Sequence, residues 1–313
     1  MNVLVTGGAG FIGRWVVKKL LEDQHDVWVI DNLSNGDVGN IEEFLSHKRF
    51  KAFYHDDIRK EEVIEQVVND SMDICYHLAA SINVQDSIDD PETTFYNDTV
   101  ASFHLLESCR KHSVKFVFMS TCMVYDQASN PQGITEEDPV KPASPYAGSK
   151  IAAENMVLSY YHAYQMPVTI VRPFNTYGPY QKTGGEGGVV PIFIKKKLNK
   201  DPIQIYGNGE QTRDLLYAED CARFVVEAGL HEEAYGEILN AGLGRDVSVN
   251  QLAELIADGR TSITHIEHIH PQSEISKLLC DYSKAKKILG WEPEVGLEEG
   301  IRRTEEWIKS NRM

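Results

Sequence analysis

Long hydrophobic runs and an excess of basic residues are both missing from this chain of 313 residues. No apolar segment approaches the roughly 18 residues that a membrane-spanning helix needs, so we expect no transmembrane segment. Lys and Arg number 31 against 47 Asp and Glu, which gives a net charge of −16. This balance argues against nucleic acids and anionic membranes as partners, because both require a basic face. It is compatible with a diphosphate ligand, which needs only local donors.

Cysteine is scarce and unpatterned, which argues against a disulfide framework. The five cysteines are odd in number and scattered: Cys75, Cys109, Cys122, Cys221 and Cys280. We interpret them as reduced thiols of a cytoplasmic protein, most of them in the core. A signal peptide is not expected, because the first apolar run is short, has no basic residues before it and leads directly into glycines. Low-complexity segments and internal repeats are also missing.

Glycines form a pattern near the N-terminus. An apolar run over residues 2–5 is followed by Gly7-Gly-Ala-Gly-Phe-Ile-Gly13 and then by apolar residues at helical spacing. In the order strand, turn, helix, Gly8 permits a tight turn, Gly10 lets the backbone approach a pyrophosphate and Gly13 lets the helix pack closely on the strand. The free N–H groups at the start of the helix would then face the phosphates of a dinucleotide.

An acidic residue follows at the spacing that a dinucleotide site requires. A second apolar run, residues 27–30, ends in Asp31, roughly twenty residues beyond the glycines. A carboxylate at this position can bind the ribose 2′-OH and would repel a 2′-phosphate, so the sequence predicts NAD rather than NADP. The alternative, an ordinary glycine-rich turn before a core helix, does not account for an acidic residue at the spacing of Asp31.

Apolar runs alternate with helical patterns through the first half of the chain. The expected strands are 2–5, 27–30, 50–54, 73–78, 115–119 and 167–172, and the expected helices include 61–68 and 91–112. This alternation predicts an α/β fold with a Rossmann-type, doubly wound parallel sheet. Ligands of such sheets bind at the carboxyl ends of the strands, where the glycine turn, Asp31, Ala79–Ser81 and Ser120–Thr121 all fall.

A smaller C-terminal α/β substrate-binding lobe should follow the sheet. We expect an NAD-binding domain of residues 1–177, to which residues 213–240 return, and a second lobe of residues 178–313. The elements expected after residue 178 are helices at 189–198, 219–229, 249–257 and 296–310 and strands at 203–206 and 261–270.

Three residues suggest oxidation and reduction of an alcohol. Ser144 and Pro145 open a helix as N-cap and first residue, and they place Tyr146 and Lys150 on one face of it. A tyrosine with a pKa of about 10 is a poor base at neutral pH, but a nearby ammonium and a cationic nicotinamide favour the phenolate. Such a tyrosine can take a proton from a hydroxyl while hydride leaves the same carbon. Thr121, at a strand end, can hydrogen-bond that hydroxyl and relay its proton.

The spacing Tyr-x-x-x-Lys is a weak signal by itself, because Tyr282 and Lys286 repeat it. That second copy has no Ser or Thr at a strand end before it and follows the last sheet elements. We therefore interpret it as a coincidence and assign the chemistry to the first copy.

Taken together, these motifs resemble the extended short-chain dehydrogenase/reductase family, in its NAD-dependent nucleotide-sugar epimerase/dehydratase branch. The C-terminal half is most similar to UDP-glucose 4-epimerases. The motifs that carry the resemblance are the glycine turn, Asp31-Asn-Leu-Ser, His77-Leu-Ala-Ala80, Ser120-Thr121, Tyr146-x-x-x-Lys150, Arg172-Pro-Phe-Asn175, Gly184–Val190, Arg213-Asp214 and Leu289-Gly-Trp-x-Pro293.

The resemblance implies a set of site residues. The catalytic candidates are Thr121, Tyr146, Lys150 and Cys122. The cofactor candidates are Gly7, Gly10, Phe11, Ile12, Asp31, Asn32, Ser34, Asp57, Ile58, Leu78, Ala79, Ala80, Asn97, Ser120, Tyr146, Lys150 and Pro173. The candidates for binding a UDP-sugar or related nucleotide-sugar are Ser81, Asn175, Val190, Gln204, Tyr206 and Arg213. The resemblance also implies a homodimer, because the family usually pairs the helices that here span 91–112 and 146–164.

Three positions depart from the family pattern. Cys122 and Met123 replace the Asp-Glu pair with which sugar-nucleotide 4,6-dehydratases eliminate water. The segment His270-Pro-Gln-Ser-Glu274 lacks the Arg that usually grips phosphate, so Arg213 and Lys277 would have to compensate. Asp126 stands where the family usually has Gly.

The departures leave three functions open. A 4-epimerase acting through a transient 4-keto intermediate is favoured, because it needs no further acid or base. A dehydratase, or another 4-keto-forming step in deoxy- or amino-sugar synthesis, would need Cys122 as its acid. The third alternative is a non-catalytic NAD-binding module on the same fold.

Histidines and Cys122 also have simpler interpretations. His265, His268 and His270 alternate on an isolated stretch without a nearby cysteine, so we expect surface or half-buried histidines and no metal. His77 is expected to pack at a strand end rather than to take part in catalysis. Cys122 can be a small residue beside the nicotinamide as well as a proton donor.

Overall fold

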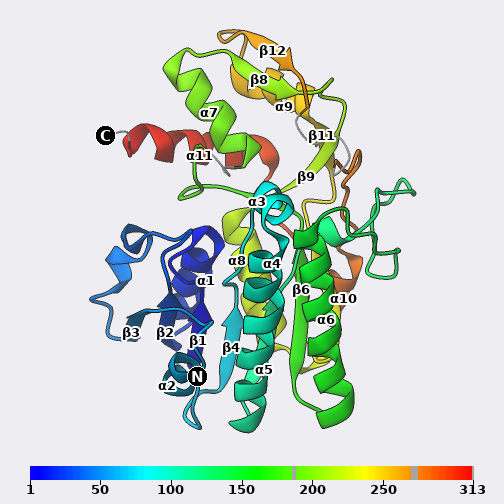
Figure 1. The fold of residues 1–313 in the computed structure, drawn as a ribbon. Coiled ribbons are helices and arrows are strands. Elements are labelled where there is room, and N and C mark those ends of the chain that lie inside the picture. Colours follow the sequence, from blue (N-terminus) through cyan, green and yellow to red (C-terminus); the bar gives the residue numbers. More distant parts are fainter. Residues whose placement is uncertain (185–187, 269–273, 312–313) are drawn as a thin grey trace.

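A seven-stranded parallel sheet forms the centre of the computed structural model, which describes residues 1–184, 188–268 and 274–311 (Figure 1). Its strands are β1 (Asn2–Thr6), β2 (Asp26–Asp31), β3 (Phe50–His55), β4 (Ile74–His77), β5 (Lys115–Met119), β6 (Val168–Pro173) and β10 (Ile238–Ala241). The order is β10-β6-β5-β4-β1-β2-β3. Read from β3 to β6, this order is 3-2-1-4-5-6, which is the strand order of a doubly wound nucleotide-binding sheet. The predicted fold class is therefore confirmed.

Both faces of the sheet are covered by helices, which explains why its strands are almost uniformly apolar. Successive residues of β1 point to opposite faces, and the core divides accordingly. Val3 and Val5 pack with α1 (Phe11–Glu22) and α8 (Ala218–Leu230). Leu4 lies in the other core, with α2 (Glu61–Val67), α5 (Ala101–Lys111) and α6 (Pro145–Tyr164).

The helix predicted over residues 91–112 is present but not uniform. It consists of α4 (Pro91–Phe95), a π-helical turn (Tyr96–Val100) and α5. A π turn displaces the backbone hydrogen bonds by one residue, and here the Ser102 hydroxyl donates to the Asp98 carbonyl at 2.7 Å. Periodicity predicted the extent of this helix but not the interruption, because one additional residue changes the apolar pattern very little.

Helix α6 begins where the sequence predicts. The Ser144 hydroxyl accepts the backbone N–H of Ala147 at 3.2 Å, and Pro145 is the first helical residue. The helix ends at Tyr164, and the next residue, Gln165, has a left-handed conformation with φ of 54°. This start fixes the rotation of α6 and turns Lys150, which is 3% exposed, towards the end of β5.

The second lobe has its own core. It contains α7 (Val189–Asn199), α9 (Val249–Ala257), α11 (Leu297–Ser310), the pair β8 (Ile203–Tyr206) and β12 (Ile263–Ile266), and a sheet in the order β11-β9-β7. The last sheet joins β7 (Asn175–Tyr177), β9 (Thr212–Tyr217) and β11 (Asp246–Ser248). The strand predicted over 261–270 is shorter, and residues 269 and 270 lie outside the described ranges. Two short helices, α3 (Val84–Asp89) and α10 (Ser283–Leu289), were not predicted.

Part of the chain beyond residue 213 lies with the central sheet. Helix α8 packs in one core with α1, and β10 pairs in parallel with β6 through Ile238 and Ile170. The division into residues 1–177 and 178–313 stays a prediction.

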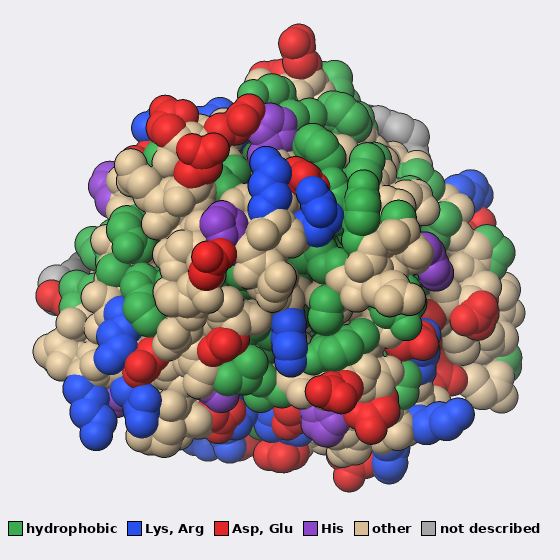
Figure 2. All heavy atoms as spheres, turned by 90° about the horizontal axis from the view of Figure 1, so that it is seen from below, with side chains coloured by type: hydrophobic (Ala, Val, Ile, Leu, Met, Phe, Trp, Pro, Cys, Tyr) green, Lys and Arg blue, Asp and Glu red, His purple; other side chains and the backbone are tan. Residues whose placement is uncertain are grey.

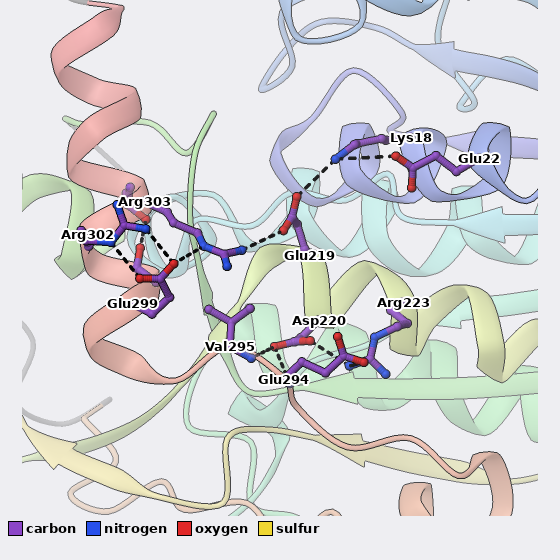
Figure 3. A network of polar contacts seen from close by, with 12 residues as sticks. Lys18, Glu22, Glu219, Asp220, Arg223, Glu294, Val295, Glu299, Arg302 and Arg303 are labelled. Atoms are coloured by element: carbon purple, nitrogen blue, oxygen red, sulfur yellow. Dashed lines mark hydrogen bonds and ion pairs between the residues drawn. The ribbon is translucent and has the colours of Figure 1, made fainter.

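Polar contacts join α8 to both α1 and α11 (Figure 3). The Glu219 carboxylate lies 3.2 Å from Lys18 of α1 and 3.5 Å from Arg303 of α11. Asp220, which is 2% exposed, accepts the backbone N–H of Val295 at 2.9 Å, just before α11 begins. The buried contact contributes more than the two surface pairs, because solvent screens exposed charges. The contacts of Arg303 and Val295 connect the start of α11 to α8.

No helix in the described part of the chain is long and apolar enough to cross a membrane. Figure 2 shows acidic, basic and hydrophobic side chains interspersed over the face that lies below the sheet in Figure 1.

Candidate active site

A cavity of about 800 Å³ lies at the carboxyl ends of the central strands. All of the predicted cofactor residues line it: Gly7, Gly10, Phe11, Ile12, Asp31, Asn32, Ser34, Asp57, Ile58, Leu78, Ala79, Ala80, Asn97, Ser120, Tyr146, Lys150 and Pro173. The arrangement follows from the topology, because parallel strands bring their carboxyl ends to one edge of the sheet. Their individual roles stay predictions.

The other predicted residues divide into two groups. Thr121, Cys122, Ser81, Asn175 and Arg213 line the same cavity. The structure places three others away from the described lining: Val190 is buried in the core of the second lobe, and Gln204 and Tyr206 are exposed on β8. For these three, contact with a substrate stays a prediction from the resemblance alone.

The glycine turn leaves open space for a pyrophosphate. Gly7 has a φ of +70°, which favours glycine, and a Cβ on Gly13 would lie 2.0 Å from the Gly7 carbonyl oxygen. No side chain caps the start of α1, and its first turn contains no acidic residue. The N–H groups of this turn are therefore available to an anion, as a dinucleotide requires.

Asp31 is held by backbone donors at the edge of the cavity. Its two carboxylate oxygens accept the N–H groups of Leu33 at 2.8 Å and Ala9 at 3.0 Å. Burial raises the pKa of Asp31, and these hydrogen bonds oppose the rise. The oriented carboxylate fits a ribose with two free hydroxyls.

Sequence reasoning missed several cations and amides at this end of the cavity. Burial raises the pKa of Asp57, but hydrogen bonds from Arg59 and Asn32 outweigh it and bring that pKa to about 2. Arg59, which lines the cavity, donates to Asp57 at 2.7 Å. Lys182 donates to Asn35 at 3.3 Å and connects the segment after β7 to the loop after β2. No motif indicated these contacts: Arg59 pairs with Asp57 inside the loop after β3, and Lys182 and Asn35 come from two loops far apart in the sequence.

Thr121, Tyr146 and Lys150 converge at the other end. All three are buried and all line the cavity. The Lys150 ammonium donates to the Met119 carbonyl at 3.1 Å, and the Thr121 hydroxyl accepts the N–H of Met123 at 3.1 Å. The threonine proton is therefore free to be donated to another group.

The ionisation of Tyr146 and Lys150 depends on their surroundings. Burial raises the pKa of Tyr146, Asp98 raises it further, and the Thr121 hydroxyl lowers it. Burial lowers the pKa of Lys150, while Asp98 and Glu154 raise it. The charge on Lys150 thus relies on nearby carboxylates.

A buried ion pair supports these residues from behind. The Arg172 Nε donates to Glu154 at 2.8 Å, and both residues are at most 3% exposed. The Ser120 hydroxyl also donates to Glu154. These contacts fix the end of β5 to α6 and β6. Removing one partner would leave a buried charge uncompensated, which typically costs about 3–5 kcal/mol.

Proton-transfer groups are few near Thr121. Burial raises the pKa of Cys122 to about 12, so its thiol stays protonated at neutral pH, and Met123 has no exchangeable proton. The carboxylates among the described lining residues lie at the end of β2 or in the loops after β2 and β3, at the ribose end: Asp31, Asp37, Asp56 and Asp57. Within that lining, no Asp–Glu pair stands beside Thr121.

Arg213 lines the cavity but already has protein partners. Its guanidinium donates to the carbonyls of Thr212 at 2.7 Å and Ile275 at 2.8 Å and pairs with the Glu274 carboxylate. The other oxygen of Glu274 lies 2.7 Å from His268. Residues 270–273 of the segment that lacks the usual Arg lie outside the described ranges, and Lys277 is not among the described lining residues.

The remaining candidates that the structure describes are not among the residues that line the cavity. His265 bonds to Asn250 at 3.0 Å, and His270 falls outside the described residues. Tyr282 makes an edge-to-face contact with Trp291, and Lys286 pairs with Glu292 at 2.6 Å. The second Tyr-x-x-x-Lys copy is therefore not part of the described lining of the cavity.

Comparisons with known proteins agree with this geometry. Pal from Bacillus thuringiensis, an X-ray structure, is 64% identical, with a TM-score of 0.98 and 100% of both chains covered. UDP-glucose 4-epimerase of Thermotoga maritima, solved with UDP-glucose, is 36% identical, with a TM-score of 0.91 and 99% of each chain covered. The dTDP-glucose 4,6-dehydratase DesIV of Streptomyces venezuelae, solved with NAD, is 28% identical, with a TM-score of 0.92, covering 100% of this chain and 98% of that one.

The profile of the family described as GDP-mannose 4,6-dehydratase matches residues 4–304. The match includes the glycine turn, Asp31, Thr121, Tyr146, Lys150 and most of the second lobe. It confirms the resemblance to nucleotide-sugar epimerases and dehydratases, and the chain belongs to the GDP-mannose 4,6-dehydratase family.

Proposed function

We propose that the protein is an NAD-dependent 4-epimerase of a UDP-sugar that acts through transient oxidation at C4. One observation carries the choice of reaction: Thr121, Tyr146 and Lys150 meet in the cavity, and no Asp–Glu pair lies beside them in its described lining. A similar structure solved with UDP-glucose, matched over 99% of both chains, supports the substrate class.

The residues around the cavity fit NAD. The open start of α1 would hold the pyrophosphate, Asp31 the adenosine ribose and Lys150 the nicotinamide ribose. Bound NAD would supply the hydride acceptor for C4 and return the same hydride, so no net oxidation occurs.

The chain's own residues would then move the proton. Thr121 would hydrogen-bond the C4 hydroxyl, and Tyr146 as phenolate would take its proton, with the Lys150 ammonium stabilising the phenolate. The ketosugar would turn over in the cavity, and Tyr146 would give the proton back once hydride has reached the other face. This cycle needs no group beyond the three that converge.

A dehydratase is the second candidate. It must also remove the C5 proton and expel the C6 hydroxyl, which requires two more proton-transfer groups. The protonated Cys122 thiol, adjacent to Thr121, could supply the acid, and the description of the matching family supports this reaction. Met123 cannot supply the base. A non-catalytic NAD-binding module is a third alternative that the intact Thr121, Tyr146 and Lys150 disfavour.

The reaction can be identified from its product. We expect UDP-glucose, UDP-GlcNAc or UDP-glucuronate to give a product of unchanged mass with inverted C4 and no net use of NAD, measured by mass spectrometry and NMR. Cys122→Ala should then be nearly harmless. A product lighter by one water would instead identify a dehydratase. Cys122→Ala should then abolish the formation of that product.

We also propose a cytoplasmic homodimer formed by the helices of residues 91–111 and 145–164. These helices expose large apolar side chains: Phe95, Tyr96, Phe103, Met156 and Tyr164, each 38–56% exposed. Light scattering at micromolar concentration should give twice the mass of one chain. Phe103→Glu should give a monomer, because a charge would lie in the apolar interface. Leu255→Glu, on the similarly exposed Leu255 of α9, should leave the dimer intact.

A further inference from the structure

Asp98 is a buried carboxylate that is only half satisfied. It is 0% exposed, and its Oδ1 accepts the backbone N–H of Ser81 at 2.6 Å. Its Oδ2 is buried and has no hydrogen-bond partner among the described residues. A buried carboxylate oxygen is costly to leave without a partner, so its position requires an explanation.

A chain of hydrogen bonds holds the π turn that carries Asp98. The Ser102 hydroxyl donates to the Asp98 carbonyl, so it must accept from His77 Nε2, which lies at 2.8 Å. His77 Nδ1 is then the acceptor for the Thr6 hydroxyl at 2.7 Å, whose oxygen accepts the N–H of Ala79 at 3.2 Å. Every donor in this series of hydrogen bonds has an acceptor only if the His77 ring is neutral.

The π turn is also fixed to α6 beside Lys150. The Thr99 hydroxyl donates to the Ser149 carbonyl at 2.9 Å, which aligns the residue after Asp98 with the residue before Lys150. The ammonium of Lys150 uses one donor for the Met119 carbonyl. The two other donors are available to a carboxylate and to a ribose hydroxyl.

The other titratable groups around Lys150 are either neutral or already paired with a group of opposite charge. Burial, followed by the repulsion from Lys150, brings the pKa of His77 to about 3. Glu154, which also raises the pKa of Lys150, is paired with Arg172. On the side of the cavity, Cys122 is protonated and Arg213 is paired with Glu274. Asp98 is the remaining carboxylate, in the described chain, whose charge acts on both Lys150 and Tyr146.

We propose that the Asp98 carboxylate is a positioning residue, the counter-ion that orients the Lys150 ammonium and thereby sets the protonation of the Tyr146–Lys150 pair. The inference rests on the proposed function, because the proposed function assigns a catalytic role to Tyr146 and Lys150. Burial raises the pKa of Asp98, and both Lys150 and the Ser81 N–H oppose this rise, which is the direction in which an ammonium acts on a nearby carboxylate.

The isosteric change Asp98→Asn tests this role. A nearby negative charge makes proton loss harder for the phenol and for the ammonium alike, so its removal lowers the apparent pKa of the pair whichever group titrates. The rising limb of kcat against pH should move to lower pH by about one unit. Asp90→Asn, at the exposed N-cap of α4, is the matched control and should leave the limb in place.

A spectroscopic titration separates this inference from the proposed reaction. Tyrosinate absorbance of the NAD complex, with the titration of Tyr146→Phe subtracted, reads the pair directly and should show the same downward shift in Asp98→Asn. If no epimer forms but the titration shifts, the reaction is wrong and the role of Asp98 stands. The role of Asp98 is overturned if Asp98→Asn lowers Tm but leaves both the tyrosinate titration and the rising limb of kcat in place. It is also overturned if either of them moves to higher pH. If Asp98→Asn does not fold, Asp98→Ser removes the same charge and is read in the same way.

Discussion

Tyr146→Phe should lower kcat by at least roughly 100-fold, the usual scale of general acid–base catalysis, while the protein still folds and binds NAD. The substitution removes one oxygen from a buried ring and leaves the packing around it unchanged. The lost hydroxyl is the group that would exchange the C4 proton. Steady-state kinetics give the turnover, and the dinucleotide released on denaturation reports the cofactor.

The chain offers a matched control for this experiment. Tyr282 stands four residues before Lys286, as Tyr146 does before Lys150, but it packs against Trp291 outside the cavity. Tyr282→Phe should therefore retain near-full activity. Comparable activities of the two variants would show that the proton takes another path.

Gly13→Ala should abolish NAD binding and destabilise the protein. The added Cβ would lie 2.0 Å from the Gly7 carbonyl oxygen and 2.8 Å from the Gly8 Cα. Both contacts are with backbone, so they can be relieved only by moving the turn that would hold the pyrophosphate. We expect a loss of roughly 3 kcal/mol in the free energy of unfolding and no dinucleotide after purification. Chemical denaturation and analysis of the released nucleotide measure the two effects.

Gly148→Ala is the control for the same change of side chain. Gly148 lies inside α6, and a Cβ there would meet nothing within 4 Å. Alanine in a helix interior is favoured over glycine, so this variant should gain about 0.5–1 kcal/mol and keep its cofactor. If both variants behave alike, close packing at Gly13 is not what the site requires.

Local signals were sufficient to predict the nucleotide-binding half. The glycine turn, the acid after the second strand and the Ser144-Pro145 helix start each depend on a few neighbouring residues, and the structure has all three elements where the sequence predicts them. The position of the cavity followed from the parallel sheet, since strand ends gather at one edge. Thr121 and Tyr146 could thus be brought together without knowledge of the side-chain geometry.

Features that depend on distant residues could not be predicted in this way. The π turn around Asp98 is stabilised by Ser102 and His77, and the pairing of Arg213 with Glu274 joins residues far apart in the chain. Similarly, residues 213–240 were expected to return to the sheet, but the pairing of β10 with β6 was not specified. Short elements such as α3 are missed because six residues carry too little periodicity.

The position of β10 has a consequence for how the protein is made. Strand β6 is synthesised before every element of the smaller sheets, and among the described residues its outer edge pairs with β10 alone. Until residue 241 has left the ribosome, that edge presents unpaired N–H and C=O groups, which can template pairing with another chain. The central sheet therefore needs β10, a strand that is synthesised after α7 and β8, before this edge is protected from aggregation, and a fragment cut after residue 177 would keep the edge exposed.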